Sequence, residues 1–424
     1  MTSDITINGQ RLLQRLDDFA RIGGTPAGGV NRQALSEEDR QSRRLLAELA
    51  RARGFRLFQD PMANLFIRRE GRLGDRPTFV IGSHLDSQPS GGRFDGALGT
   101  LSAFEVVESL EDAGLETDLP LEVVVWTNEE GSRFAPGTMG SMAFAAGAIP
   151  KAWSDLRGTD GAPFPAELKA TVDALPEAEM RPLGFPISGY LELHIEQGPS
   201  LEREGIPIGI VHGIQGTRWL EITITGQAAH AGTTALGFRR DPMAAAVAAL
   251  DILFKSIMPG DERARFTVGR FAAEPGSVNA IPGSVVFTVD LRHPEPSVID
   301  ALEAKIRSTC TTAAGAHGCD AAFRRFFEMP PATLSQDLVA CLGRAAAALR
   351  LPVKRMISGA FHDALFINRV APAAMIFVPC RDGLSHNEAE YVEPADAATG
   401  AQMLLASTLE AMREIASAES SNEP

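Results

Sequence analysis

The stretch Val80–Gly96, VIGSHLDSQPSGGRFDG, ends an apolar run in a histidine and follows it with two aspartates. The run Thr78–Ser83 is apolar without alternation, which is typical of a strand covered on both faces. His84 and Asp86 lie two residues apart, so in an extended segment their side chains point the same way. That pair suits a metal-ligating imidazole supported by a carboxylate, although a buried histidine in a polar loop is an alternative. Asp95 then follows a Gly-rich turn, at the strand end where open α/β sheets carry their sites.

The residues after Gly96 also predict buried secondary structure. Leu98–Asp112 carries apolar residues along one side and predicts a helix, and Leu121–Thr127 is a second buried, β-branched strand. The order strand, helix, strand indicates an α/β layer. We therefore expect a mixed sheet covered by helices on both faces.

Three more strand-like segments lead into chargeable side chains. VVVWTNEEGSRF carries the adjacent acids Glu129 and Glu130, which point in different directions, so one can ligate a metal while the other acts as general base. GYLELHIEQGP contains His194 and Gln197 at its end, and MIFVPCRDGLSHNEAE delivers His386 after a loop. Four such strand ends predict a single site.

The segment from about Ile214 to Glu328 has a different pattern. Its strands and helices follow the order β-α-β-β-α-β, the ferredoxin-like arrangement, in which helices cover one face of a four-stranded sheet. We interpret residues 213–329 as an inserted α+β domain. Residues 1–212 and 330–424 then form the two parts of a catalytic α/β domain.

Composition excludes several classes of function. The 424 residues contain 40 Lys and Arg against 54 Asp and Glu, giving a net charge of −14 and no basic stripe, so neither nucleic acid nor an anionic membrane surface is an expected partner. The first residues, MTSDITINGQ, lack the pattern of a signal peptide. The four cysteines are scattered without CxxC spacing. We expect a cytoplasmic protein that acts on a small molecule.

As a set, GSHLDS…GGRFDG, NEEGSRF, ELHIEQGP, GQAAHAGTT, PGSVNAIPG…DLRH and SHNEAE resemble the amidase–hydantoinase–carbamoylase family of dinuclear metallohydrolases. That family includes N-carbamoyl-L-amino-acid hydrolases, β-ureidopropionases and allantoate amidohydrolases, and it is related to aminoacylases and dimetal carboxypeptidases. The similarity runs from about Leu16 to Leu405. It implies two divalent metal ions per subunit, an inserted lid and dimerisation domain, and a homodimer formed through that domain. Imidazole and carboxylate ligands without thiolate suit zinc, manganese or cobalt.

The resemblance also assigns residues. It implies that one metal is held by His84, Asp95 and His194, and that Asp95 bridges to a second metal completed by Glu130 and His386. The remaining roles it implies are catalysis or substrate binding: Glu129 as general base, Asp86 orienting His84, His230 stabilising the oxyanion from the partner subunit, and Gln197, Asn279 and Arg292 holding the substrate.

The implied reaction is hydrolysis of the carbamoyl (ureido) C–N bond of an N-carbamoyl amino acid or related ureido acid by metal-activated water. Ammonia, carbon dioxide and the amine are the products. Allantoate hydrolysis is the nearest alternative; an N-acyl amino acid hydrolase or dipeptidase fits His194 and Gln197 less well. A binding protein that has lost catalysis is disfavoured because every ligand and Glu129 are present. Phe361 replaces a family glycine in SGAFHDA, which bears on the substrate pocket, and His362 beside it is a further site candidate.

Overall fold

The computed structural model describes residues 5–420, which divide into two compact units. The first unit is Met1–His212 with Leu334–Pro424, and the second is Gly213–Thr333. No helix within the described residues is long and apolar enough to cross a membrane.

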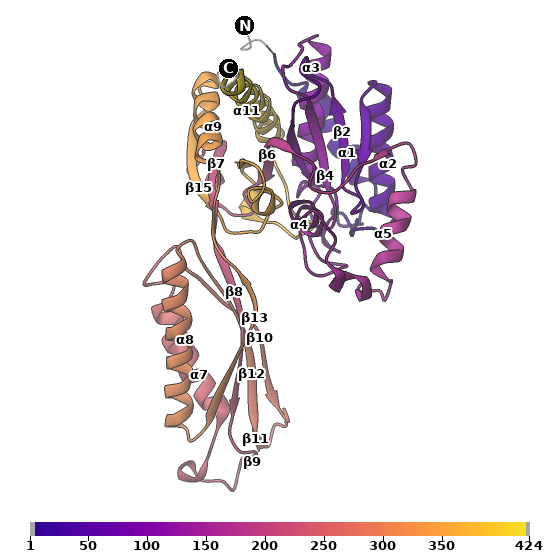
Figure 1. The fold of residues 1–424 in the computed structure, drawn as a ribbon. Helices are drawn as coiled ribbons and strands as arrows, with labels where there is room; N and C mark the ends of the chain where they lie inside the picture. Colours follow the sequence, from indigo (N-terminus) through magenta and orange to yellow (C-terminus); the bar gives the residue numbers. More distant parts are fainter. Residues whose placement is uncertain (1–4, 421–424) are drawn as a thin grey trace. The chain divides into compact units, whose positions relative to one another are not determined.

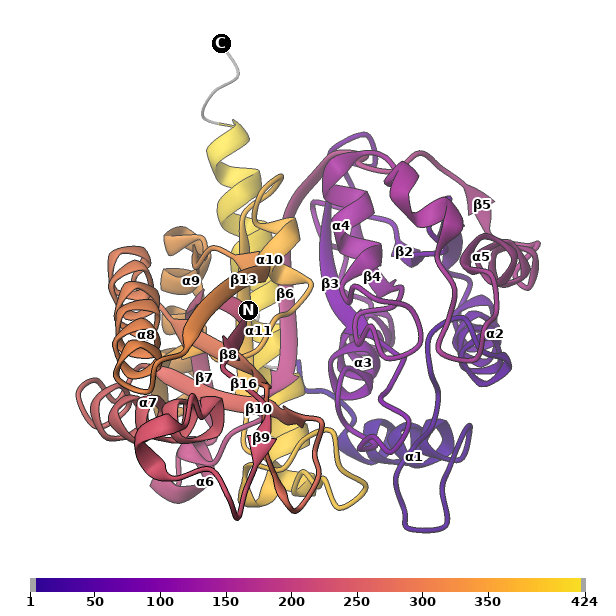
Figure 2. The same cartoon turned by 90° about the horizontal axis from the view of Figure 1, so that it is seen from below.

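The first unit is built on a mixed sheet whose path runs β14-β7-β16-β6-β3-β4-β2-β1-β5, with β15 paired to β7; the short strand β14 at one end of this path belongs to the second unit. Figure 2 shows β6, β3, β4 and β2 side by side in that order. The strands are β1 (Arg56–Gln59), β2 (Leu65–Arg69), β3 (Thr78–His84), β4 (Leu121–Trp126), β5 (Glu179–Met180), β6 (Ile187–Ile195), β7 (Ile208–Ile214), β14 (Ala332–Thr333), β15 (Val353–Ser358) and β16 (Ala373–Val378).

Four parallel strands form the centre of this sheet. β16 pairs with β6, β6 with β3 and β3 with β4, all in parallel, whereas β2 and β7 are antiparallel to their neighbours. These four strands are the segments whose ends carry the predicted site residues. Because they run the same way, their carboxyl ends meet at one edge of the sheet.

Helices cover both faces of the sheet, as expected. Alternate residues of the central strands, such as Val123, Val125 and Leu193, join the core against α3 and α11, while Trp126 and Tyr190 pack on the opposite face near α4. The helices of this unit are α1 (Gly9–Ala20), α2 (Glu37–Ala52), α3 (Ala97–Asp112), α4 (Met139–Ala146), α5 (Phe164–Asp173), α6 (Ser200–Glu204), α9 (Gln336–Leu349), α10 (Ala364–Ile367) and α11 (Pro394–Ser420).

Helix α3 follows the loop that carries Asp95, and it is buried nearly all round rather than along one side. Its two acids on the covered side, Glu105 and Glu108, are 0% and 1% exposed and pair with Arg11, Arg15 and Arg53. Pairing is what makes buried carboxylates tolerable. The helix that supports the Asp95 loop is therefore fixed on every side.

The second unit has the βαββαβ order that its sequence predicts. Its four-stranded sheet has the order β10-β12-β8-β13, fully antiparallel, and α7 and α8 lie on one face of it (Figure 1). The elements are β8 (Gly216–Thr225), β9 (Ala229–His230), α7 (Pro242–Ser256), β10 (Arg265–Glu274), β11 (Ala280–Ile281), β12 (Ser284–His293), α8 (Pro296–Ala316) and β13 (Asp320–Met329).

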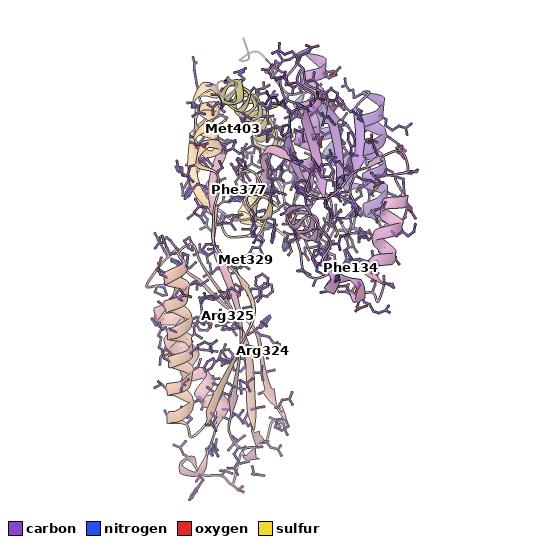
Figure 3. The ribbon with its side chains drawn as sticks, viewed as in Figure 1. Phe134, Arg324, Arg325, Met329, Phe377 and Met403 are labelled. Carbon is purple, nitrogen blue, oxygen red and sulfur yellow. The ribbon has the colours of Figure 1, made fainter. Side chains whose placement is uncertain are left out.

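Strand alternation separates the two faces of this second sheet. On β12 every second residue, from Val285 to Leu291, is buried under the helices. On β13 the neighbouring residues Arg324 and Arg325 (Figure 3) reach opposite faces: Arg325 pairs with Glu303 of α8 at 2.6 Å, and Arg324 with Glu221 on the open face at 2.9 Å. One face is thus core, and the other carries the Arg324–Glu221 pair and is accessible within this unit.

Candidate metal centre

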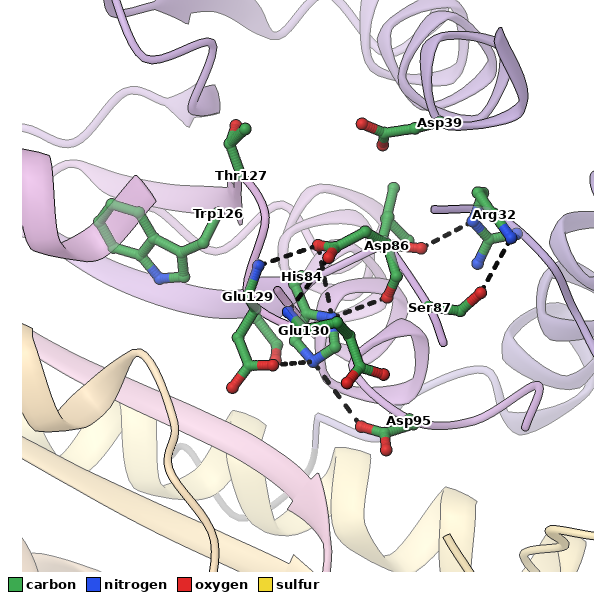
Figure 4. A network of polar contacts seen from close by, with 12 residues as sticks. Arg32, Asp39, His84, Asp86, Ser87, Asp95, Trp126, Thr127, Glu129 and Glu130 are labelled. Carbon is green, nitrogen blue, oxygen red and sulfur yellow. Dashed lines mark hydrogen bonds and ion pairs between the residues drawn. The ribbon is translucent and has the colours of Figure 1, made fainter. Parts of the chain in front are cut away.

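The side chains that follow β3, β4, β6 and β16 gather at the carboxyl edge of the sheet. Figure 4 shows His84, Asp86, Asp95, Glu129 and Glu130 within one polar network. Left-handed backbone recurs in these loops, at Gly96 (φ 63°), Asn128 (φ 56°), Gln197 (φ 56°) and His386 (φ 54°). Such conformations are costly for residues other than glycine and cluster at functional sites.

Two buried histidines each present the same ring nitrogen to the centre. His84 donates its Nδ1 hydrogen to the main-chain carbonyl of Asp86 at 2.9 Å, and His194 does the same to Ile195 at 3.1 Å. A carbonyl can only accept, so in the neutral ring it fixes the tautomer and leaves the Nε2 lone pair available. Both Nε2 atoms are buried without a hydrogen-bond partner among residues 5–420. This is how a histidine is prepared to ligate a metal.

Asp95 lies between these rings. Its Oδ1 is 3.0 Å from His194 Nε2 and 3.7 Å from His84 Nε2, and its Oδ2 is 3.6 Å from His386 Nε2. Gly96 allows this approach, since a Cβ there would lie 2.3 Å from the His84 ring. An aspartate oxygen facing two imidazole lone pairs is stable only with a positive charge between them.

The pKa values of the histidines and carboxylates in this centre also indicate that it favours an added positive charge. Burial alone would lower the pKa of His194, but Asp95 outweighs it and raises that pKa to about 9, whereas burial lowers the pKa of His84 to about 4. Burial raises the pKa of Glu129 well above its usual range, with further contributions from Asp363 and Glu130. Bound divalent cations offset such a concentration of carboxylates.

The adjacent acids after β4 are oriented by Asp86. Its carboxylate accepts hydrogen bonds from the backbone N–H groups of Glu129 and Glu130, both at 3.2 Å (Figure 4). The carboxylate oxygen Oδ1 lies 3.7 Å from His84 Nδ1, so the main-chain carbonyl of Asp86, rather than its side chain, makes the hydrogen bond to that ring. Asp86 therefore links the ends of β3 and β4, and its carboxylate positions the Glu129–Glu130 turn.

Glu129 and Glu130 face different neighbours, as expected for adjacent residues. Glu129 Oε2 is 3.6 Å from His84 Nε2, whereas Glu130 Oε2 is 3.2 Å from His386 Nε2 and accepts a hydrogen bond from Gln88 at 2.7 Å. His386 is half exposed, at 52% of its side chain. The two carboxylates are thus available for separate functions.

Three groups of side chains in the described part of the chain could hold a metal ion. In each, the ligand atoms lie within 4.8 Å of one another, and the groups are His84–Asp95–His194, Asp95–Glu130–His386 and Glu192–His194–His362. The first two share Asp95 and contain the five ligands that the sequence predicts. His362 is 1% exposed, and its ring centroid is 4.5 Å from that of His194.

The predicted substrate-binding residues of the second unit lie on two of its strands and a loop. His230 Nδ1 accepts hydrogen bonds from the backbone of Gly232 (3.1 Å) and Thr233 (3.2 Å), so the hydrogen of the neutral ring is on Nε2. Asn279 lies beside it, because its carbonyl accepts from Ala231 N at 3.0 Å. Arg292, on β12, forms a bidentate pair with Asp290 of the same strand.

Several residues of the centre were not singled out from the sequence. Ser385 and Glu390 flank His386 in SHNEAE; Ser385 contacts Asp95, and Glu390 accepts hydrogen bonds from the backbone N–H groups of Phe94 and Asp95 at 3.0 Å each. Glu192 is fully buried and accepts from Ser83 at 2.8 Å. A charge two residues before His194 in an otherwise apolar strand is the signal that could have indicated Glu192.

Comparison with known proteins identifies the family. Residues 80–410 match the model of peptidase family M20/M25/M40. An N-carbamoyl-L-amino acid amidohydrolase from Geobacillus stearothermophilus is 38% identical over 407 residues, covering 94% of this chain and 97% of that protein. A ureidoglycolate hydrolase from Oryza sativa subsp. japonica is 32% identical over 95% of this chain and 84% of its own. The crystal structure of a hydantoinase/carbamoylase family amidase from Burkholderia multivorans superposes with a TM-score of 0.90 at 42% identity, covering 96% and 98% of the two chains. The chain therefore belongs to peptidase family M20/M25/M40.

Proposed function

We propose that this protein hydrolyses the carbamoyl C–N bond of an N-carbamoyl amino acid, releasing ammonia, carbon dioxide and the amine. The observation that carries the proposal is the pair of buried imidazole Nε2 lone pairs of His84 and His194, which converge on Asp95 with Glu129 beside them. The near full-length similarity to N-carbamoyl-L-amino acid amidohydrolases supports the choice of substrate class.

We propose that the centre holds two divalent ions, of zinc, manganese or cobalt. His84, His194 and Asp95 would hold the first, and Asp95, Glu130 and His386 the second, as the two overlapping groups allow. When bound, such ions lower the pKa of a coordinated water and polarise the substrate carbonyl. The ligand atoms are nitrogen and oxygen only, which suits these metals.

Glu129 is the proposed general base. It takes a proton from the attacking water and later delivers that proton to the departing nitrogen. Its carboxylate is buried, and its turn is held by Asp86, so its position is set before substrate arrives. General acid–base catalysis requires this fixed geometry as well as the correct charge state.

The second unit would supply the remaining groups. His230 can donate its Nε2 hydrogen to the oxygen that becomes negative in the tetrahedral intermediate. Asn279 and Arg292, together with Gln197 of the first unit, would hold the substrate carboxylate and ureido group; a guanidinium matches a carboxylate bidentately. We propose that the protein is a homodimer formed through the second unit and that His230 acts in the partner's site.

A second candidate is hydrolysis of another α-ureido acid, such as allantoate or ureidoglycolate. The observation that favours it is the near full-length similarity to the ureidoglycolate hydrolases of rice and Arabidopsis thaliana. These compounds also join a ureido group to a carboxylate, so the same residues can act on them.

The test of the function uses metal-reconstituted protein and follows ammonia release from the ureido acids and release of the free amino acid from N-acyl amino acids and dipeptides. N-carbamoyl-L-amino acids, β-ureidopropionate, allantoate and ureidoglycolate are offered side by side with N-acyl amino acids and dipeptides. We expect turnover of N-carbamoyl-L-amino acids to exceed that of each other substrate. Preference for allantoate or ureidoglycolate selects the second candidate, and hydrolysis of only N-acyl amino acids or dipeptides contradicts both.

The shared site predicts complementation between two inactive variants. Glu129→Gln and His230→Ala subunits, co-expressed in equal amounts with different tags, are expected to recover about a quarter of the wild-type activity, because random pairing makes half of the dimers mixed and each mixed dimer has one complete site of two. Each variant expressed alone serves as the control. If the co-expressed protein is no more active than the two variants mixed after purification without subunit exchange, His230 does not act across the dimer.

A further inference from the structure

We infer that Ser385, acting with Gln197, is a positioning residue that fixes the Oδ2 atom of Asp95 and thereby sets the affinity of the second metal position, formed by Asp95, Glu130 and His386. The inference rests on the proposed function for the existence of two metal positions. It assigns a role to Ser385 and gives Gln197 a contact within the metal centre in addition to its proposed contact with substrate.

The two oxygens of Asp95 have different surroundings. Oδ1 faces the rings of His194 and His84. Oδ2 accepts hydrogen bonds from Ser385 Oγ at 2.7 Å and from Gln197 Nε2 at 3.0 Å, and it also faces His386. A carboxylate offers about four lone-pair positions. The two hydrogen bonds to Oδ2 fix the rotation of the carboxylate, and this rotation sets where Oδ2 faces His386 and where Oδ1 faces His84 and His194.

Ser385 and Gln197 also contact each other, since Gln197 Nε2 donates to Ser385 Oγ at 3.0 Å. The three groups form a closed triangle, so neither donor can turn away without breaking two contacts. Gln197 has left-handed backbone two residues after the end of β6, and Glu390 accepts a hydrogen bond from the backbone N–H of Asp95. The backbone of Asp95 is therefore held by Glu390, and its carboxylate is held by Ser385 and Gln197.

This arrangement acts unequally on the two metal positions. His84 and His194 are fixed by their own carbonyl contacts, so the first position keeps two rigid ligands if Asp95 turns. The second position contains His386, which is half exposed, and Glu130, so it depends on Oδ2 staying in place. Ser385 precedes His386 directly, which couples the hydroxyl to the loop that carries this ligand.

The test is metal binding by Ser385→Ala, with Ser385→Thr as the conservative variant. Ser90→Ala is the matched control, because Ser90 is an exposed serine in the loop between β3 and α3. Each protein is stripped of metal and equilibrated with zinc at buffered free concentrations, and bound zinc per subunit is measured by atomic emission. Thermal unfolding of the stripped proteins reports on folding independently of metal.

We expect Ser385→Ala to bind the first zinc as the wild type does and the second about 10- to 100-fold more weakly, the usual effect of removing a hydrogen bond to a ligand. Ser385→Thr should restore the second affinity, and Ser90→Ala should match the wild type. Unchanged binding of both ions by Ser385→Ala overturns the inference, as does an equal loss of both. Wild-type protein that takes up two zinc ions but hydrolyses no ureido acid contradicts the proposed function and leaves the role of Ser385 standing.

Discussion

Replacing Glu129 by glutamine is expected to lower kcat for ureido hydrolysis about 10⁴-fold, the upper end of what general acid–base catalysis contributes. That loss corresponds to about 5 kcal/mol of activation free energy. Glutamine keeps the size of the side chain, but its amide cannot take the proton of the attacking water or return it to the leaving nitrogen. The measurement is the initial rate of ammonia release at saturating substrate.

The structure supplies a matched control for this variant. Glu196 also follows β6 near the centre, but its carboxylate accepts hydrogen bonds from the backbone N–H groups of Ser200 and Leu201 at the start of α6. Glu196→Gln should keep kcat within a few-fold of the wild type. Metal content of Glu129→Gln should also be unchanged. A kcat within tenfold of the wild type in Glu129→Gln would remove this residue from the base role.

The second large effect is expected for Asp95→Asn. Asp95 is common to the His84–His194 group and the Glu130–His386 group, so one substitution removes a ligand from both. The new amide also presents either an N–H group or a neutral oxygen where an ionised carboxylate stood. Neighbouring imidazoles outweigh the effect of burial and hold the pKa of Asp95 well below its usual range, so the wild-type group is charged.

We expect Asp95→Asn to lose tight binding of both ions after dialysis, with no measurable turnover. His386→Ala is the comparison, because it affects the second group alone and should retain one tightly bound ion per subunit. Atomic emission gives the metal content, and circular dichroism checks that each variant is folded. Two tightly bound ions in Asp95→Asn would contradict a shared bridging ligand.

The local pattern of the sequence was sufficient for much of the fold. The pattern of Leu98–Asp112 predicts a helix, and α3 spans Ala97–Asp112. Apolar, β-branched runs predicted the buried strands β3 and β4, and the order of strands and helices predicted the βαββαβ unit. These features depend on contacts between residues close in the chain, which local sequence encodes.

The details of the site depended on contacts that are distant in sequence. Asp95 meets Ser385 across 290 positions and Gln197 across 102 positions. The Asp86 side chain was expected to support His84, but its carboxylate is used by the backbone of Glu129 and Glu130. Strand periodicity gives the face of a residue but not which of its polar groups reaches a partner.

The sequence by itself determined the fold class, the family resemblance and the identities of the candidate ligands, because residue types and their spacing carry that information. Only the tertiary structure decided which strand ends are neighbours, namely β16, β6, β3 and β4. It also decided which atoms of His84, Asp86 and Asp95 face one another. The physical reason is that strand pairing and side-chain rotation are settled by packing between segments that local sequence cannot bring together.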